Sequence, residues 1–329
     1  MIDKSSIDVT TAWLVDPVEP GVRAQALLYF AGRARDDPVV TAAQEESLVR
    51  GSIAKILDGL AVPSDPSDLW EPKYGAPYHR LIALAQMGAP SNDERIIKVL
   101  DACLEAFAKP DGGFGRSNSH LCTTGNMVAT ATHFGRGDDA RVKRGIQWLL
   151  TQQRADGGWN CFPEDEPGST VDSWEPLAAL GATPWSQRSP EVERAINLGV
   201  AFFLEQHLGI DNGYEPWRRI HFPRHYYYDF LLGLELATNL GDQHDARLKP
   251  ALDLLVSKRS ADGCWALDAT HPDVDPEGDP PYKPIYAKMM AETVRLEVEP
   301  PGVPSRWATL AAMRVLQSVG IADAANDKT

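Results

Sequence analysis

Three short stretches of the chain carry side chains that could do chemistry. The first holds His120 and Cys122, the second holds Asp172, and the third holds His225 and Tyr228. Imidazole nitrogen, thiolate sulfur and carboxylate oxygen are the atoms that bind Zn²⁺, and a bound metal with one open position can activate a water or a thiolate. An Asp that stays protonated in an apolar pocket can instead donate a proton. Metal-assisted and acid-initiated chemistry are therefore the two predictions, with Cys122, Asp172, His225 and Tyr228 as candidate catalytic residues.

The metal prediction requires four side chains to meet. The expected ligands are His120, Cys122, Asp172 and His225, with Cys161 as a spare candidate. They lie far apart in sequence, so the fold must bring them together. Each also has a structural alternative, because cysteine is commonly buried, a core histidine can be satisfied by a neighbour, and an Asp can cap a helix.

A second set of residues could bind a substrate. Aromatic ring faces can line a cavity for an apolar chain and stabilise a carbocation, although a Trp or Tyr at helical spacing is more often core packing. Arginine can pair with diphosphate oxygens, although scattered arginines are usually surface residues. The candidates of both kinds are Trp174, Trp217, Tyr226, Tyr227, Trp307, Arg116, Arg218, Arg219 and Arg224, and of these we take the aromatic residues and Arg224 as substrate-binding.

A repeated phrase indicates how the chain positions these side chains. It reads KPDGGFG up to Gly115, QQRADGGW up to Trp159 and SKRSADGCW up to Trp265. Self-similarity of this kind is typical of repeat proteins. The Asp-Gly-Gly core predicts a tight turn with positive φ, under which the aromatic ring packs and fastens one repeat to the next.

Two kinds of helix lie between these turns. Amphipathic, charged stretches with apolar residues at three- and four-residue spacing predict outer helices at Glu94–Phe107, Ala140–Gln152, Pro190–Glu205 and Asp245–Val256. Stretches poor in charge predict inner helices at about 22–32, 78–88, 121–135, 171–181, 225–241 and 306–320. Alternating inner and outer helices can close into a ring, so we expect an all-α fold, an (α/α)₆ toroid formed by residues 1–329 as a single domain.

Two insertions lengthen the repeat, at Leu208–Pro223 and Leu267–Pro284, and a sixth outer helix is expected in Ile285–Leu296. Long connections of this kind are typical of lids and binding rims. The second insertion contains Asp273 and Asp275 among prolines, which predicts solvated loop charge, or alternatively a Mg²⁺ site for a diphosphate substrate.

Composition excludes some partners. The net charge is −14 and no basic run is present, which argues against a nucleic-acid surface. No stretch approaches the roughly 18 apolar residues of a membrane span, and no basic region followed by an apolar run opens the chain. Four cysteines without a CxxC pair favour reduced thiols. We therefore expect a cytoplasmic protein with a small-molecule substrate.

The repeated phrase resembles the QW motif of the terpenoid cyclase and protein prenyltransferase superfamily, whose members fold as α/α toroids with a cavity lined by the beginnings of inner helices. The stretch GGFGRSNSHLC is similar to the zinc-ligand region of protein prenyltransferases: Cys122 matches the thiolate ligand, His120 stands where the family has an aspartate, and His225 is one residue from the histidine position. Thr170–Ser173 resembles the DxDD motif of class II cyclases with only the middle Asp, Asp172, retained.

This resemblance implies an enzyme that acts on an isoprenoid-like apolar substrate in a central cavity, with metal-assisted chemistry through zinc or another divalent metal. The alternatives are a metal-free, acid-initiated cyclase using Asp172, a metal-dependent hydrolase or lyase, and a non-catalytic binding toroid. Related cyclases usually pair two such barrels and the prenyltransferases need a partner subunit, so the resemblance also implies a homo-oligomer or a partner subunit.

Overall fold

The computed structural model describes residues 4–162, 166–225, 227–269, 296 and 298–321. This part of the chain is all-α: its regular elements are α-helices and short 3₁₀ turns, and its extended pairing is limited to four isolated bridges. Among the described helices, none has both the length and the apolar character that crossing a membrane would require. Most of the expected sixth outer helix (285–296) and the acidic loop with Asp273 and Asp275 lie outside the described residues.

The repeated phrase forms the same tight turn three times. In each copy the carbonyl of the second residue after the Asp accepts from the backbone N–H four residues earlier, which closes the turn. The Asp carboxylate accepts from the backbone N–H two residues later. The first glycine has positive φ, at 103°, 89° and 86° in the three copies, a conformation that an L side chain rarely adopts. The glycines are Gly112, Gly157 and Gly263.

The aromatic residue after each turn is fixed to the next inner helix. The backbone N–H of Trp159 donates to Ser173 Oγ at 2.8 Å, and that of Trp265 donates to Thr309 Oγ1 at 2.9 Å. Both rings are fully buried, and each indole N–H donates to a backbone carbonyl ten residues earlier, in the preceding outer helix. The motif therefore ties each outer helix to the inner helix that follows it, as its sequence predicts.

Six helices correspond to the expected inner helices. They begin within two residues of the predicted starts except for the fifth, and most of their side chains are buried. They are α2 (Pro20–Tyr29), α5 (Pro77–Gln86), α7 (Leu121–His133), α9 (Thr170–Ala182), α11 (Phe230–Leu240) and α14 (Arg306–Ser318).

The outer helices follow their amphipathic pattern closely. Three of them begin and end at the predicted residues: α6 (Glu94–Phe107), α8 (Ala140–Gln152) and α10 (Pro190–Glu205), each capped by an Asp or Ser side chain. The fourth is α12 (Lys249–Ser257), preceded by a 3₁₀ turn at Ala246–Leu248. The N-terminal helices are α1 (Lys4–Leu14), α3 (Pro38–Ser47) and α4 (Gly51–Leu57).

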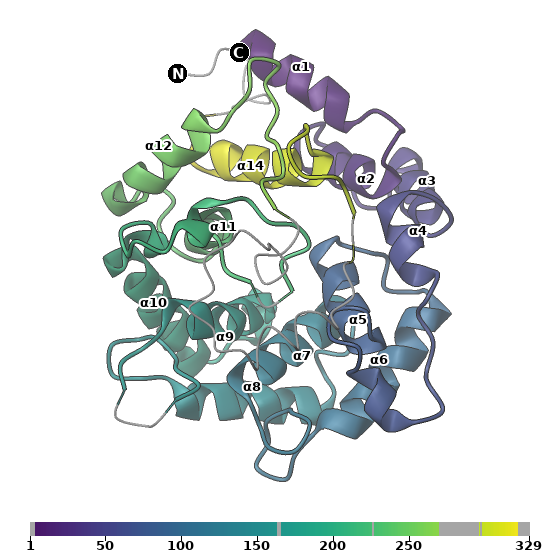
Figure 1. The fold of residues 1–329 in the computed structure, drawn as a ribbon, viewed down its shortest axis with the longest axis vertical. Helices are drawn as coiled ribbons and strands as arrows, with labels where there is room; N and C mark the ends of the chain where they lie inside the picture. Colours follow the sequence, from purple (N-terminus) through teal and green to yellow (C-terminus); the bar gives the residue numbers. More distant parts are fainter. Residues whose placement is uncertain (1–3, 163–165, 226, 270–295, 297, 322–329) are drawn as a thin grey trace.

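The chain runs around the molecule in sequence order, and α14 returns to lie beside α2 and α11 (Figure 1). Among the inner helices, α5 contacts α7, α7 contacts α9, α9 contacts α11, and α11 contacts α14. The most extensive of these contacts joins α7 to α9. The first turns of α7 and α9 contribute side chains to one common space.

The predicted inner helix at 225–241 differs from the observed one in its first turn. Asp229 caps α11 by accepting from the Leu232 N–H at 2.8 Å, so the helix begins at Phe230. His225 precedes it, in a turn, with φ of 48°. His225 and Tyr228 are therefore held by an irregular segment, and Tyr226 lies outside the described residues.

Candidate functional site

A cavity of about 1290 Å³ opens at the starts of α7 and α9. We call it the large cavity. The N-terminal residues of both helices form one wall, and the segments at 68–73 and 116–117 form the other. Its lining is Asp68, Trp70, Glu71, Pro72, Lys73, Arg116, Ser117, His120, Cys122, Thr123, Val171, Asp172 and Glu175. Three of the four predicted metal ligands, His120, Cys122 and Asp172, therefore face one space.

A second cavity, of about 200 Å³, lies deeper between the inner helices. We call it the small cavity. Most of its lining surface is apolar, although six of its thirteen lining residues have polar or charged side chains. Its lining is Ile82, Ala85, Gln86, Gly125, Asn126, Ala129, Thr130, His133, Trp174, Glu175, Ala178, Arg224 and Leu232.

Glu175 lines both cavities. Its side chain is 2% exposed, and Oε2 has no hydrogen-bond partner among the described residues. Burial raises the pKa of this carboxyl well above its ordinary value, and the negative charges of Cys122 and Asp172 raise it further. The direction of this shift favours the protonated carboxyl, which is the state that a general acid needs.

The sequence signal for Glu175 is its position, one turn after Asp172 on a helix otherwise poor in charge. An ionisable residue on a helix that must be buried on most sides is expected to have a perturbed pKa, and residues with perturbed pKa values cluster at functional sites. The DxDD resemblance directs attention to Asp172 instead, and Asp172 is half-buried at the cavity wall.

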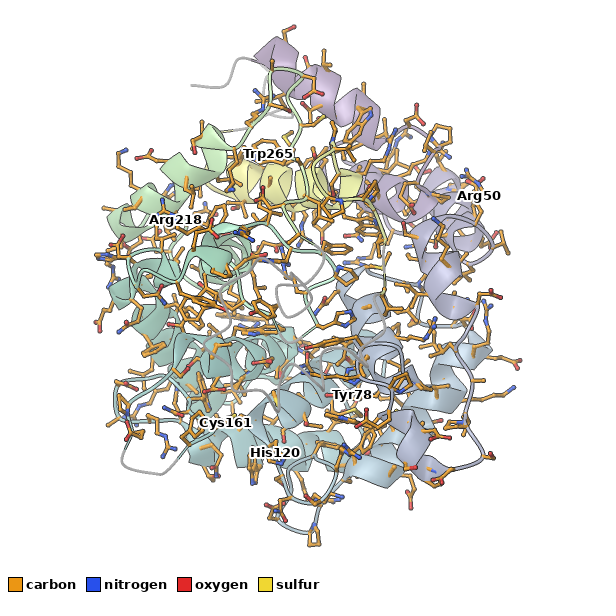
Figure 2. The ribbon with its side chains drawn as sticks, in the orientation of Figure 1. Arg50, Tyr78, His120, Cys161, Arg218 and Trp265 are labelled. Carbon is orange, nitrogen blue, oxygen red and sulfur yellow. The ribbon has the colours of Figure 1, made fainter. Side chains whose placement is uncertain are left out.

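Two thiols meet at the edge of the large cavity. Cys122 occupies the first turn of α7, and the Cys161 side chain hydrogen bonds to its sulfur. This hydrogen bond, together with those from Thr123, lowers the pKa of the Cys122 thiol despite its burial. Figure 2 shows His120 and Cys161 on the same side of the molecule. Cys122 is therefore the more acidic thiol of the pair.

His225 lies away from these residues. It is buried against Tyr74, with ring centroids 4.9 Å apart, and near His79 at 6.4 Å. Burial and the charge of Lys73 lower the pKa of His225 to about 3. It is therefore a neutral packing residue and does not line either cavity.

The donor set does not form a metal site as it stands. Among the residues that the structure describes, no group of three or more His, Cys, Asp and Glu side chains is arranged to hold a metal ion. His120, Cys122 and Asp172 line the large cavity, whereas His225 packs against Tyr74, so the four expected ligands do not meet at one point.

Most of the aromatic candidates pack in the core. Trp174 lines the small cavity, whereas Trp217, Tyr227, Tyr228 and Trp307 line neither cavity. The hydroxyl of Tyr228 donates to the Leu208 carbonyl at 2.8 Å, and burial raises its pKa well above the ordinary value. Trp217 packs edge-on against Tyr228, Tyr227 shares a hydroxyl hydrogen bond with Tyr214, and Trp307 stacks on Phe222.

Two of the arginine candidates line a cavity and two do not. Arg224 lines the small cavity, but its guanidinium pairs with Glu235 at 2.6 Å and lies 3.9 Å from Asp229. Arg116 lines the large cavity, where it pairs with Glu71 at 2.8 Å and lies over the ring of Trp70. Arg218 is exposed, and Arg219 pairs with Glu215.

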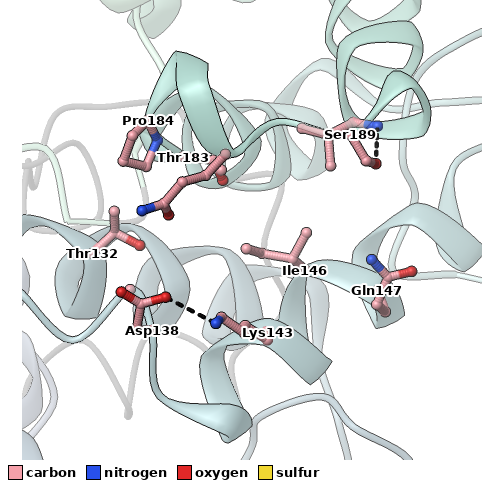
Figure 3. Close-up of a pocket in the computed structure, with 11 residues that line it drawn as sticks. Thr132, Asp138, Lys143, Ile146, Gln147, Thr183, Pro184 and Ser189 are labelled. Atoms are coloured by element: carbon pink, nitrogen blue, oxygen red, sulfur yellow. Dashed lines mark hydrogen bonds and ion pairs between the residues drawn. The ribbon is translucent and has the colours of Figure 1, made fainter.

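A further groove of about 390 Å³ lies at the opposite ends of α7 and α9, beside α8 and α10 (Figure 3). Its charged residues Asp138 and Lys143 pair with each other at 2.8 Å, and Ser189 caps α10. The groove contains neither an unpartnered acid nor a reactive thiol among its lining residues. The two cavities around Glu175 are therefore the candidate site.

Comparison with known proteins addresses the fold. No family model and no curated protein matches the chain. Among solved structures, a polysaccharide lyase is 10% identical with a TM-score of 0.52, and the match covers 96% of each chain, which shows a shared fold. A type II terpene cyclase, MstE from Scytonema, solved with geranylgeranyl dihydroxybenzoate, is 14% identical with a TM-score of 0.33 over 86% of this chain and 98% of that one. The same cyclase solved with merosterolic acid A has a TM-score of 0.32 at 14% identity, over 85% of this chain and 97% of that one.

Proposed function

We propose that this chain is an enzyme that starts its reaction by protonating a carbon–carbon double bond of an isoprenoid-like substrate, with Glu175 as the acid. The observation that carries the proposal is the buried, unpartnered Glu175 carboxyl at the junction of the two cavities. The sequence predicts Asp172 as the acid. The burial of Glu175, one helical turn later, favours Glu175 as the acid instead. The repeat architecture supports the (α/α)₆ toroid as the scaffold.

The two cavities suit an amphipathic molecule. The large cavity carries Lys73, Arg116 and His120 near its polar wall, where a hydrophilic head group can be solvated. The small cavity carries Trp174, Ala178 and Leu232, against which a hydrocarbon end can pack. A substrate lying across both would place a double bond next to Glu175.

The step balances without a cofactor. The π electrons of the double bond take the proton from the Glu175 carboxyl, which leaves a carbocation on the neighbouring carbon and a carboxylate on Glu175. The ring of Trp174 lines the same small cavity, where its face can stabilise the cation. A water molecule removes a proton from an adjacent carbon to give a neutral product, and solvent returns a proton to the Glu175 carboxylate through the large cavity.

Deuterium incorporation tests the proposal. The wild-type protein is incubated in D₂O with geraniol, farnesol and geranylgeraniol, and the products are analysed by mass spectrometry. We expect one carbon-bound deuterium in a new product, loss of about 10³-fold or more in rate in Glu175→Gln, and a smaller loss in Asp172→Asn. Full activity in Glu175→Gln, or no conversion of any of these alcohols or their ether and ester derivatives by the wild type, would refute the assignment.

A lyase acting on an acidic sugar polymer is the second candidate. The shared fold with the polysaccharide lyase and the charged lining of the large cavity favour it, since Lys73 and Arg116 could bind carboxylates there. Release of unsaturated sugar products from alginate or a glycosaminoglycan would support the lyase function over the protonation of an isoprenoid.

Two metal-dependent mechanisms stay proposals. One is zinc-assisted chemistry at His120, Cys122 and Asp172, and the other uses Mg²⁺ with a diphosphate substrate. Elemental analysis of untagged protein beside Cys122→Ala tests them: near-stoichiometric zinc that is lost in the variant would support a metal site. Its absence after purification without chelators would count against it.

A further inference from the structure

The small cavity collects polar atoms that have no partner. Asn126 is 4% exposed and its Nδ2 lacks a hydrogen-bond partner among the described residues, as does Oε2 of Glu175. Nε of Arg224 differs from these two atoms, because it lies 3.9 Å from the Asp229 carboxylate and forms an ion pair with it. Asn126 and Glu175 both line this one space. Because buried polar groups in native proteins are nearly always hydrogen bonded, the two unpartnered atoms together indicate that another group occupies the cavity.

The size of the cavity limits the occupant. A cavity of 150 Å³ in another protein holds benzene, so about 200 Å³ accommodates a group of six or seven non-hydrogen atoms. Most of the lining is apolar, including Ile82, Trp174 and Leu232. The occupant is therefore a small apolar group with a polar atom on it.

The unpartnered atoms determine which polar atom fits. The amide Nδ2 of Asn126 is a donor, and the carboxyl of Glu175 is a donor while it is protonated. The donors need an acceptor. A negatively charged acceptor is disfavoured, because Arg224 is already paired with Glu235 and lies near Asp229, so this region has no positive charge to spare.

We propose that the small cavity is a binding subsite for an uncharged acceptor oxygen, such as a carbonyl or ether oxygen, on the apolar end of the substrate. Asn126 donates to this oxygen, and the surrounding apolar side chains hold the carbon frame. The link to turnover rests on the proposed function, whereas the binding subsite itself does not. If both hold, the substrate carries an oxygen beside the position that Glu175 protonates.

Two probes of the same shape test the subsite. Cyclohexanone carries the acceptor oxygen, and methylenecyclohexane replaces it with a CH₂ group. Each is titrated into ¹⁵N-labelled protein, and the Asn126 side-chain amide signal is followed by NMR. We expect cyclohexanone to bind about 3-fold to 10-fold more tightly than methylenecyclohexane, as one hydrogen bond in a dry site predicts, and to shift the Asn126 signal.

Asn126→Leu keeps the volume and removes the donor, and it should abolish the preference for the ketone. Asn239→Leu, at an exposed position on α11, is the matched control and should keep it. Folding of each variant is checked from its NMR spectrum, and Asn126→Ala removes the donor with a smaller side chain should the leucine variant unfold. Equal affinities for the two probes in the wild type, or an unchanged preference in Asn126→Leu, would overturn the inference.

The outcomes separate this inference from the proposed function. If Glu175→Gln stops deuterium incorporation while the two probes bind with equal affinity, the proposed reaction is supported and the oxygen subsite is refuted. If cyclohexanone binds more tightly than methylenecyclohexane but no isoprenoid is converted, the subsite is supported and the proposed reaction is refuted.

Discussion

Gly125 of α7 lies directly against the backbone of Glu175 of α9. A β-carbon placed on Gly125 would be 2.6 Å from the Glu175 carbonyl carbon and 2.7 Å from its Cβ, closer than real atoms pack. The absence of a side chain at Gly125 therefore sets how closely α7 approaches α9, and with it the position of the proposed acid between the two cavities.

We expect Gly125→Ala to lower the free energy of unfolding by about 1–3 kcal/mol, because one helix must move away from the other. Urea denaturation measures this. Gly137→Ala is the control, since a β-carbon there would meet its nearest neighbour at an ordinary 3.5 Å. Equal stability of the two variants would contradict the tight contact.

The raised pKa of Glu175 makes stability depend on pH in a defined direction. A carboxyl with a raised folded-state pKa contributes stability that is fully present below its unfolded value, about 4.5, and that is lost as pH rises through the folded pKa. The stability of Glu175→Gln relative to wild type should therefore increase above about pH 4.5, by up to about 1.4 kcal/mol per pH unit, and then level off. A constant difference between pH 4 and pH 8 would show that folding does not raise the pKa of Glu175.

His225 should remain neutral in acid. Its pKa of about 3 results from burial and from the charge of Lys73, so the folded protein should show a neutral imidazole at pH 5 by ¹⁵N NMR. The stability that this neutral state contributes is present above pH 6.5 and is lost as pH falls toward 3. His225→Asn, which tolerates positive φ, identifies the signal. A ring that titrates near 6.5 would mean that His225 is solvated.

The thiol pair predicts selective alkylation. Cys122 should react with iodoacetamide faster than Cys103, whose pKa is raised by burial. Cys161→Ala removes the hydrogen bond that lowers the Cys122 pKa, so the rate at neutral pH should fall, by as much as about tenfold for each unit of pKa. Peptide mass spectrometry gives both rates, and an unchanged Cys122 rate in the variant would contradict the pairing.

The Ser173 hydroxyl, which accepts a hydrogen bond from the Trp159 backbone N–H, should contribute to stability. Ser173→Ala leaves that buried N–H without its partner, which should cost about 1–3 kcal/mol in the free energy of unfolding. Ser318→Ala is the control, because the Ser318 hydroxyl bonds within its own last helical turn. Thermal or urea unfolding compares the two, and similar losses would argue against a special role for the motif.

Local pattern was sufficient for much of the fold. The amphipathic period predicts α6, α8 and α10 at their observed bounds, because a helix with one wet face repeats its apolar residues every three or four positions. The Asp-Gly-Gly turns are likewise predicted by local chemistry, since positive φ and an Asp that accepts from the backbone depend only on neighbouring residues.

The site itself depended on contacts between distant segments. Residue types alone placed Cys122 and Asp172 at helix starts, and these do share the large cavity. His225 was assigned to a helix, but the cap at Asp229 delays α11 and directs the imidazole toward Tyr74. The acid character of Glu175 arises from burial between two helices 50 residues apart in sequence, with Gly125 opposite Glu175. The sequence by itself determined the helices and turns, because these depend on neighbouring residues. Only tertiary packing decided which carboxyl was desolvated by burial and became the candidate acid.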